Sequence, residues 1–120
     1  MFRLVIAGSR DFNDYDLLKQ KCDYYLSKKI KDNEDIIIVS GTAKGADLLG
    51  ERYAEEKGFK IERYPAKWDL YGKSAGYRRN AEMVAVADAV IVFWDGKSKG
   101  TKHTIDLADK KGIRLVIVRF

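Results

Sequence analysis

Short apolar runs alternate along the chain with longer stretches in which apolar residues recur at helical spacing. The runs predict five strands, at Arg3–Ala7, Ile36–Val39, Lys60–Tyr64, Ala89–Trp94 and Arg114–Val118. The longer stretches predict four helices, at Tyr15–Lys31, Lys44–Lys57, Tyr77–Val86 and Thr101–Lys111. Between the third strand and the third helix, the segment Ala66–Gly76 predicts irregular structure.

Particular residues mark where these helices begin, end and pack. Asn13 or Asp14 suits the N-cap of the first helix, because a short polar side chain accepts from a free backbone N–H there. Gly58 is placed to end the second helix. The buried face of that helix is expected to consist of Leu48, Leu49, Tyr53 and Ala54.

Apolar residues fill consecutive positions in the strand runs, which is typical of strands buried on both faces of a sheet. Strands that alternate with helices through short connections predict a parallel sheet with right-handed crossovers. We therefore expect an α/β fold in which residues 1–120 form a single domain. The expected architecture is a Rossmann-like three-layer sandwich with a five-stranded parallel sheet of order 3-2-1-4-5.

Composition narrows the classes of partner. The net charge of +5 favours phosphate-bearing ligands, but no dense block of Lys and Arg suggests a nucleic-acid-binding arm. No apolar run approaches the ~20 residues that span a bilayer, and the first residues do not resemble a signal peptide. A lone Cys22, expected to pack within the first helix, fits a reducing, cytoplasmic location. One histidine and one cysteine cannot form a standard zinc site, so no metal is expected. No cofactor is expected either.

Three strand-like runs end in turns that suit anions: Gly8–Asp11, Ser40–Asp47 and Asp95–Thr101. Glycine lets backbone approach a ligand, and the free N–H groups of a following helix attract negative charge. In the expected strand order these turns meet at the switch point of the sheet. The residues expected there to bind a ligand or phosphate are Gly8, Ser9, Arg10, Gly41, Thr42, Lys44, Gly45, Asp47, Gly96, Ser98, Gly100 and Thr101.

Each of these residues also has an ordinary structural interpretation. The turn at Ser40–Asp47 lacks both the Walker A and the three-glycine dinucleotide spacing, which disfavours an NTPase or a standard dehydrogenase. It is equally typical of a plain strand-to-helix turn. Arg10 suits either a phosphate clamp or an ion pair with a nearby aspartate. Asp47 suits either a ribose hydroxyl or the N-terminus of its own helix.

The segment after the third strand carries aromatic and basic candidates. Trp68 is expected to stack on a base, although packing against the domain is the competing interpretation. Arg79 and Asn80 follow Arg78 near the start of a helix, where positive charge opposes the helix dipole unless an anion lies nearby. His103 is expected on a helix surface, with acid–base chemistry as the alternative.

Taken in order, the motifs resemble the YspA-like (YpsA-related) branch of the SLOG superfamily. The motifs are Val5–Asp11, Ser40-Gly41-x-Ala43-Lys44-Gly45-Ala46-Asp47, Gly76-x-x-Arg79-Asn80-x-x-Met83, Ala87-Asp88 and Gly96-x-Ser98-x-Gly100-Thr101. The resemblance implies a Rossmann-like domain that binds a nucleotide, a nucleotide sugar or a related ligand, and that forms homo-oligomers. Relatives include the LOG phosphoribohydrolases and the single-stranded-DNA-binding protein DprA.

The resemblance to the phosphoribohydrolases is partial. Arg79 matches their Arg-Lys-x-x-Met motif, with Asn80 in the lysine position, and is thus the candidate catalytic residue. Gly100-Thr101 is kept, but Thr104 occupies the position of the glutamate that assists glycosidic cleavage. Asp106 would point about 160° away from that position and would replace the glutamate only with a shifted helix start.

The leading hypothesis is therefore a domain that binds a nucleotide or a phosphorylated ribose derivative. A nucleotide N-glycosidic hydrolase and a single-stranded DNA-binding protein are the alternatives.

Overall fold

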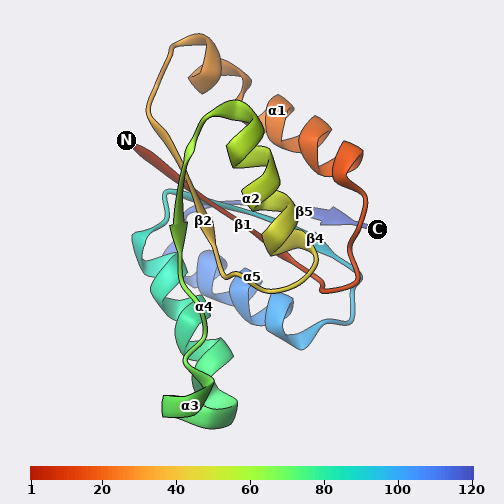
Figure 1. Cartoon of the computed structure of the whole chain (residues 1–120), viewed down its shortest axis with the longest axis vertical. Coiled ribbons are helices and arrows are strands. Elements are labelled where there is room, and N and C mark those ends of the chain that lie inside the picture. Colours follow the sequence, from red (N-terminus) through yellow and green to blue (C-terminus); the bar gives the residue numbers. More distant parts are fainter.

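The computed structural model describes all 120 residues as one five-stranded parallel sheet flanked by helices (Figure 1). The strand order β3-β2-β1-β4-β5 confirms the predicted α/β architecture. The strands are β1 (Phe2–Gly8), β2 (Ile36–Ser40), β3 (Lys60–Arg63), β4 (Ala89–Trp94) and β5 (Arg114–Arg119). The helices are α1 (Tyr15–Lys31), α2 (Ala46–Lys57), α3 (Trp68–Tyr71), the 3-10 turn η1 (Gly72–Ser74), α4 (Ala75–Val86) and α5 (Lys99–Lys111).

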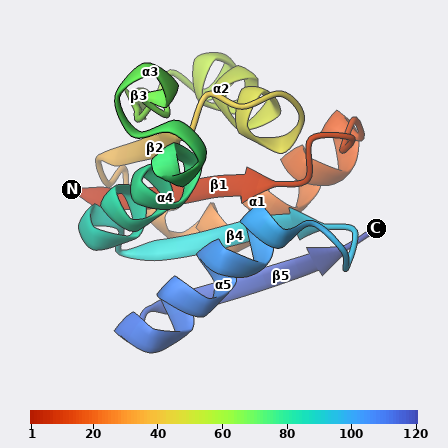
Figure 2. The same ribbon diagram turned by 90° about the horizontal axis from the view of Figure 1, so that it is seen from below.

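The helices divide between the two faces of the sheet, as right-handed crossovers require. In Figure 2, α4 and α5 lie in front of the strands and α1 is seen behind them. Alternate residues of β1 therefore enter different cores. Leu4 and Ile6 pack with α1 and α2, whereas Val5 and Ala7 pack with α4 and α5. No helix combines the length and apolar character needed to cross a membrane.

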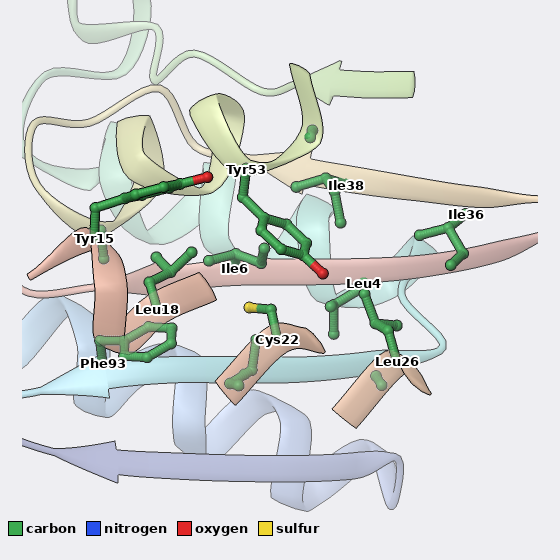
Figure 3. Close-up of a cluster of buried hydrophobic side chains, with 14 of the residues drawn as sticks. Leu4, Ile6, Tyr15, Leu18, Cys22, Leu26, Ile36, Ile38, Tyr53 and Phe93 are labelled. Carbon is green, nitrogen blue, oxygen red and sulfur yellow. The ribbon is translucent and has the colours of Figure 1, made fainter. Parts of the chain in front are cut away.

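The core on the α1 and α2 face contains the lone cysteine. Figure 3 shows Cys22 beside Leu4, Ile6 and Tyr53. Its side chain is fully buried, and burial raises the pKa of the thiol to about 12. The thiol is thus protonated at neutral pH, and Cys22 serves as a small apolar residue of this core.

The predicted buried face of α2 is wrong at Leu48, whose side chain is 48% exposed. Tyr53 and Ala54 are fully buried as expected. Leu49 is partly buried against the core. Two small residues of α2, Ala46 and Gly50, are also buried, and Gly50 lies so close to Ile6 that an added Cβ would be 2.9 Å from its side chain. Small residues allow the helix to pack close to the sheet. A prediction based on large apolar side chains does not identify them.

The prediction of irregular structure over Ala66–Gly76 is also wrong, because α3, η1 and the start of α4 occupy most of it. Short-range backbone hydrogen bonds form these helical turns, although apolar residues do not recur at helical spacing in this segment. The carbonyl of Lys67 accepts from the N–H groups of Leu70 and Tyr71, both at 3.0 Å, and Gly72 ends the turn at a φ of 56°. Figure 1 shows that α3 lies at one end of the molecule.

Three helix starts differ from expectation or settle an open choice. Asp14, rather than Asn13, caps α1 by accepting from the N–H of Leu17 at 3.1 Å. The second helix begins at Ala46 rather than Lys44, because Gly45 has a φ of 89° that no helix contains. The last helix begins at Lys99 rather than Thr101, with Ser98 as the N-cap.

Candidate functional site

The turns that follow β1, β2 and β4 are bonded to one another through Ser9. Its N–H donates to Phe93 O at 2.9 Å, and its Oγ accepts from the N–H of Asp95 at 3.2 Å. Its carbonyl accepts from the N–H of Ala46 at 3.4 Å. The residue is only 1% exposed, so its hydroxyl joins loops of the protein rather than facing a ligand.

Gly45 fits closely against the first turn. A Cβ at this position would lie 2.5 Å from the carbonyl oxygens of both Ser9 and Arg10. Its positive φ is a conformation that residues with a side chain adopt only at a cost in free energy. Glycine is therefore required here by packing within the protein.

A cavity of about 100 Å³ lies where the three turns converge. Most of the sequence-predicted residues line it: Gly8, Arg10, Asp47, Arg79, Asn80, Ser98, Gly100 and Thr101. Sequence reasoning did not select four further lining residues, Ala7, Ala43, Met83 and Thr104. Of these, Met83 was marked by the Arg79-Asn80-x-x-Met83 motif, and the two alanines carry no chemical signal.

The remaining predicted residues lie outside this lining. Gly41 is buried directly behind it, where a Cβ would lie 2.6 Å from Asp47 Oδ2 and 2.9 Å from Arg79 Nη1. Thr42 donates its N–H to Ser40 Oγ at 3.0 Å. Lys44 and Gly45 line a neighbouring hollow, and Gly96 lies against the guanidinium of Arg119. The structure thus gathers eight of the fourteen residues predicted to bind a ligand or phosphate at the cavity.

Arg79 spans the cavity with a half-buried charge. Its Nε donates to Asn80 Oδ1 at 3.0 Å, and its Nη1 donates to the carbonyl of Gly41. Its Nη2 has no hydrogen-bond partner in the protein, and the seven ion pairs of the structure do not include it. Burial lowers the pKa of this guanidinium, partly offset by the negative charge of Asp47. An anion in the cavity would relieve this cost.

Asp47 is the buried carboxyl group of the cavity, with a residue exposure of 4%. It comes from the first turn of α2, and its Oδ2 accepts from the N–H of Ala43 at 3.2 Å. Burial raises the pKa of the carboxyl to about 6, against the opposing effects of the Ala43 N–H and of Arg79. The group is therefore mostly ionised at pH 7.

Asn80 holds α4 against the last turn. Its Oδ1 accepts from Arg79, while its Nδ2 donates to the carbonyl of Gly100 at 3.2 Å and lies 3.4 Å from His103 Nδ1. Burial lowers the pKa of His103, which favours the neutral ring. Asn80 therefore positions Arg79 and Gly100, the residues at the mouth of the cavity.

A second hollow of about 230 Å³ opens beside the cavity and shares Arg10, Arg79, Asn80 and Gly100 with it. Its other lining residues are Trp68, Lys73, Gly76 and Tyr77. The indole of Trp68 is about half exposed, as a ring available for stacking would be. Arg78 differs from its neighbour Arg79, because it lies over the ring of Tyr71 and lines neither space.

A third hollow, of about 420 Å³, adjoins the second through Tyr77 and covers the start of α5. Lys97, Lys99 and Lys102 give it positive charge, and Trp94 and His103 add aromatic surface. Asp106 lines this outer hollow, where it pairs with Lys102 at 2.5 Å. The helix start is shifted by two residues, yet Asp106 does not line the cavity.

The cavity therefore contains one carboxyl group, supplied by α2 rather than α5. The hydroxyl of Thr104, which also lines it, donates to the carbonyl of Gly100 at 3.4 Å. Asp47 and Arg79 together supply one carboxylate and one guanidinium, the two groups that the hydrolase hypothesis invokes. No group of three or more His, Cys, Asp and Glu side chains gathers as a metal site would require.

Comparison with known proteins places these features in a family. The family model for YspA, cpYpsA-related SLOG proteins matches residues 2–71. The Gene 61 protein of Mycobacterium phage D29 is 35% identical over 122 residues, which cover 97% of this chain and 95% of that protein.

Two solved structures of DNA processing protein A share the fold. The protein from Helicobacter pylori, studied for its single-stranded DNA binding mode, gives a TM-score of 0.66 at 22% identity. The protein from Streptococcus pneumoniae gives a TM-score of 0.69 at 20% identity. Each alignment covers 97% of this chain, but this chain spans only 64% and 49% of the two larger proteins, respectively.

Proposed function

This chain belongs to the YspA, cpYpsA-related SLOG family, and on that premise we propose that its cavity binds a nucleotide or another phosphorylated ribose derivative. The observation that carries the proposal is a half-buried arginine without an ion pair, Arg79, facing a cavity at the switch point of a parallel sheet. Arg10 lines the same cavity and also forms no ion pair. An anionic ligand would complete the electrostatics of both side chains.

The start of α5 supplies backbone donors for the same anion. The N–H of Gly100 has no acceptor within the protein, and a Cβ at Gly100 would meet no atom within 4 Å. A phosphate there would accept from this N–H group and interact favourably with the helix dipole. The adjoining hollow with Trp68 is larger and would take the flat base.

Isothermal titration against nucleoside monophosphates, ADP-ribose and nucleotide sugars tests this proposal. We expect at least one of them to bind, and Gly100→Leu to abolish that binding because the added side chain enters the open space at the cavity mouth. Lys110→Leu, at an exposed position of the same helix, is the matched control and should bind normally. Absence of binding at millimolar concentrations would contradict the proposal. Chromatography of the same mixtures for free base tests the hydrolase alternative.

Single-stranded DNA binding is the second candidate, and the basic outer hollow favours it. Lysines beside exposed or half-buried aromatic rings suit a strand whose bases stack while its phosphates are neutralised. The fold likeness to DNA processing protein A of Helicobacter pylori points in the same direction.

Fluorescence anisotropy with a labelled oligothymidylate would decide this second candidate. We expect affinity to fall between 50 and 200 mM salt, and Lys97→Ala/Lys99→Ala to weaken binding and flatten the salt dependence. Lys28→Ala/Lys31→Ala removes the same charge from the far end of α1 and should have less effect. Equal effects of the two double variants would mean non-specific attraction to a basic protein.

A further inference from the structure

One oxygen of the Asp47 carboxyl lacks a partner. Oδ2 accepts from the N–H of Ala43, but the structure gives no hydrogen bond to Oδ1. The residue is 96% buried, and it lines the cavity. Tyr15 Oη is the only fully buried side-chain polar atom without a partner, so Oδ1 of Asp47 is exposed to the cavity. A carboxylate oxygen in so confined a space is poorly hydrated, which costs free energy when no protein group donates to it. The arrangement is completed when a bound molecule donates to this oxygen.

The donor must be neutral or positively charged, which excludes a phosphate at this end of the cavity. An ionised carboxyl repels a phosphate group, and Glu51, one helical turn further along α2, adds negative charge behind it. The start of α5, which also lines the cavity, contributes the free N–H of Gly100. The cavity is therefore polarised, and it accepts an anion at α5 and a hydrogen-bond donor at α2.

The sizes of the two spaces indicate that the hydrogen-bond donor to Asp47 belongs to the sugar of the ligand. The space beside Asp47 is about 100 Å³, whereas the hollow lined by Trp68 is about 230 Å³, and the two share Arg79 and Gly100. A base fits the larger hollow beside the indole ring. The part of a nucleotide between base and phosphate, the ribose, then lies nearest to Asp47.

Resting on the proposed function, we infer that Asp47 selects ribose over deoxyribose by accepting a hydrogen bond from a ring hydroxyl of the ligand. A ligand that lacks this hydroxyl leaves Oδ1 of Asp47 unpaired and covers it from water, so the ligand binds more weakly. The same geometry disfavours DNA within the cavity and directs any DNA contact to the outer hollow at α5.

Titration of matched ligands tests the inference. The probes are the four ribonucleoside monophosphates with their 2′-deoxy and 3′-deoxy counterparts. For a ribonucleotide that binds, we expect one deoxy counterpart to bind about ten-fold more weakly or worse, as a lost hydrogen bond to a charged group implies. In Asp47→Ala this discrimination should shrink to about two-fold or less. Asp109→Ala, which removes an exposed carboxylate from α5, should retain it.

The possible failures are distinguishable. Equal affinities of the ribonucleotide and both deoxy forms for the unaltered protein overturn the selection by Asp47 but leave nucleotide binding intact. Discrimination that persists in Asp47→Ala also overturns it, provided circular dichroism shows the variant folded. If Asp47→Ala does not fold, Asp47→Leu replaces it as a near-isosteric apolar variant, read in the same way. Absence of binding by every probe, and by ADP-ribose and the nucleotide sugars as well, overturns the inference together with the proposed function.

Discussion

The turns before α2 and α5 look alike in sequence, yet only one of them is open. Both combine glycine, a hydroxyl and lysine between a buried strand and a helix. Before α2, Gly45 is wedged against the carbonyls of Ser9 and Arg10, and Asp47 accepts the N–H of Ala43. Before α5, Ser98 caps the helix, and Gly100 faces open space with its N–H free.

The difference shows that a glycine-rich turn at a helix N-terminus is not in itself an anion site. In the α2 turn, the N–H of Ala43 donates to the carboxylate of Asp47, which gives that end of the cavity negative charge. In the α5 turn, the N–H groups of Lys97 and Ser98 donate to Asp95 Oδ1, and that of Thr101 donates to Ser98 Oγ. The N–H of Gly100 accordingly remains as a donor beside open space. One turn therefore provides structural support and an acceptor, whereas the other provides the anion site that we propose.

Replacing Gly45 and Gly100 by alanine should reveal the largest difference between the two turns, measured as a change in stability. Gly45→Ala places a Cβ 2.5 Å from two carbonyl oxygens at a φ of 89°, so we expect a loss of about 3 kcal/mol or more in the free energy of unfolding. Gly100→Ala meets no atom within 4 Å and replaces glycine in a helix, so its stability should be unchanged or slightly greater. Urea unfolding measures both.

The pair carries its own control, since each variant adds one methyl group to the same sheet edge. Similar losses in both would mean that the α5 turn is packed as tightly as the α2 turn. That result would remove the open mouth on which the proposed phosphate site depends.

Asp47→Asn tests whether the carboxyl of the α2 turn is ionised and lowers the stability of the fold. Because burial raises the pKa of Asp47 from 3.8 to about 6, the folded protein holds this proton more tightly than the unfolded chain. Ionisation therefore destabilises the fold above pH 6, and this effect disappears below about pH 4. The variant should exceed the parent in stability by about 2–3 kcal/mol at pH 8, with the difference vanishing at pH 4.

Unfolding curves at several pH values measure this difference, with Asp109→Asn as a control for an exposed carboxyl. The charges that face Asp47 are those of Arg79, Glu51 and Arg10, and of these only Glu51 raises its pKa. A gain that does not vary with pH would show that the carboxyl is not strained by burial. A destabilising carboxylate at a cavity is typical of a residue kept for binding or chemistry.

The strand order could be predicted from sequence because consecutive apolar runs and short connections leave few topologies for a parallel sheet. The same argument located the edge where the cavity lies. It could not separate Gly45 from Gly100, since the distinction depends on carbonyls of Ser9 and Arg10 contributed by another turn. Nor could it show that Ser9 is buried or that Oδ1 of Asp47 is unpartnered, because both follow from three-dimensional packing.

The smallest expected effect concerns the N-caps of α2 and α5, in which the two turns also differ. Gly45 gives α2 no side-chain cap, whereas Ser98 Oγ accepts from the N–H of Thr101 at 3.4 Å. Ser98→Ala should therefore cost about 1 kcal/mol in urea unfolding, and Ser98→Asp should recover that loss because aspartate caps equally well.

The Ser98→Asp variant nevertheless places a negative charge on the cavity lining. If the α5 turn is the end that holds the anion, Ser98→Asp must bind a nucleoside monophosphate more weakly than Ser98→Ala despite its greater stability. The opposite ranking would move the phosphate away from α5 and with it the distinction between the two turns.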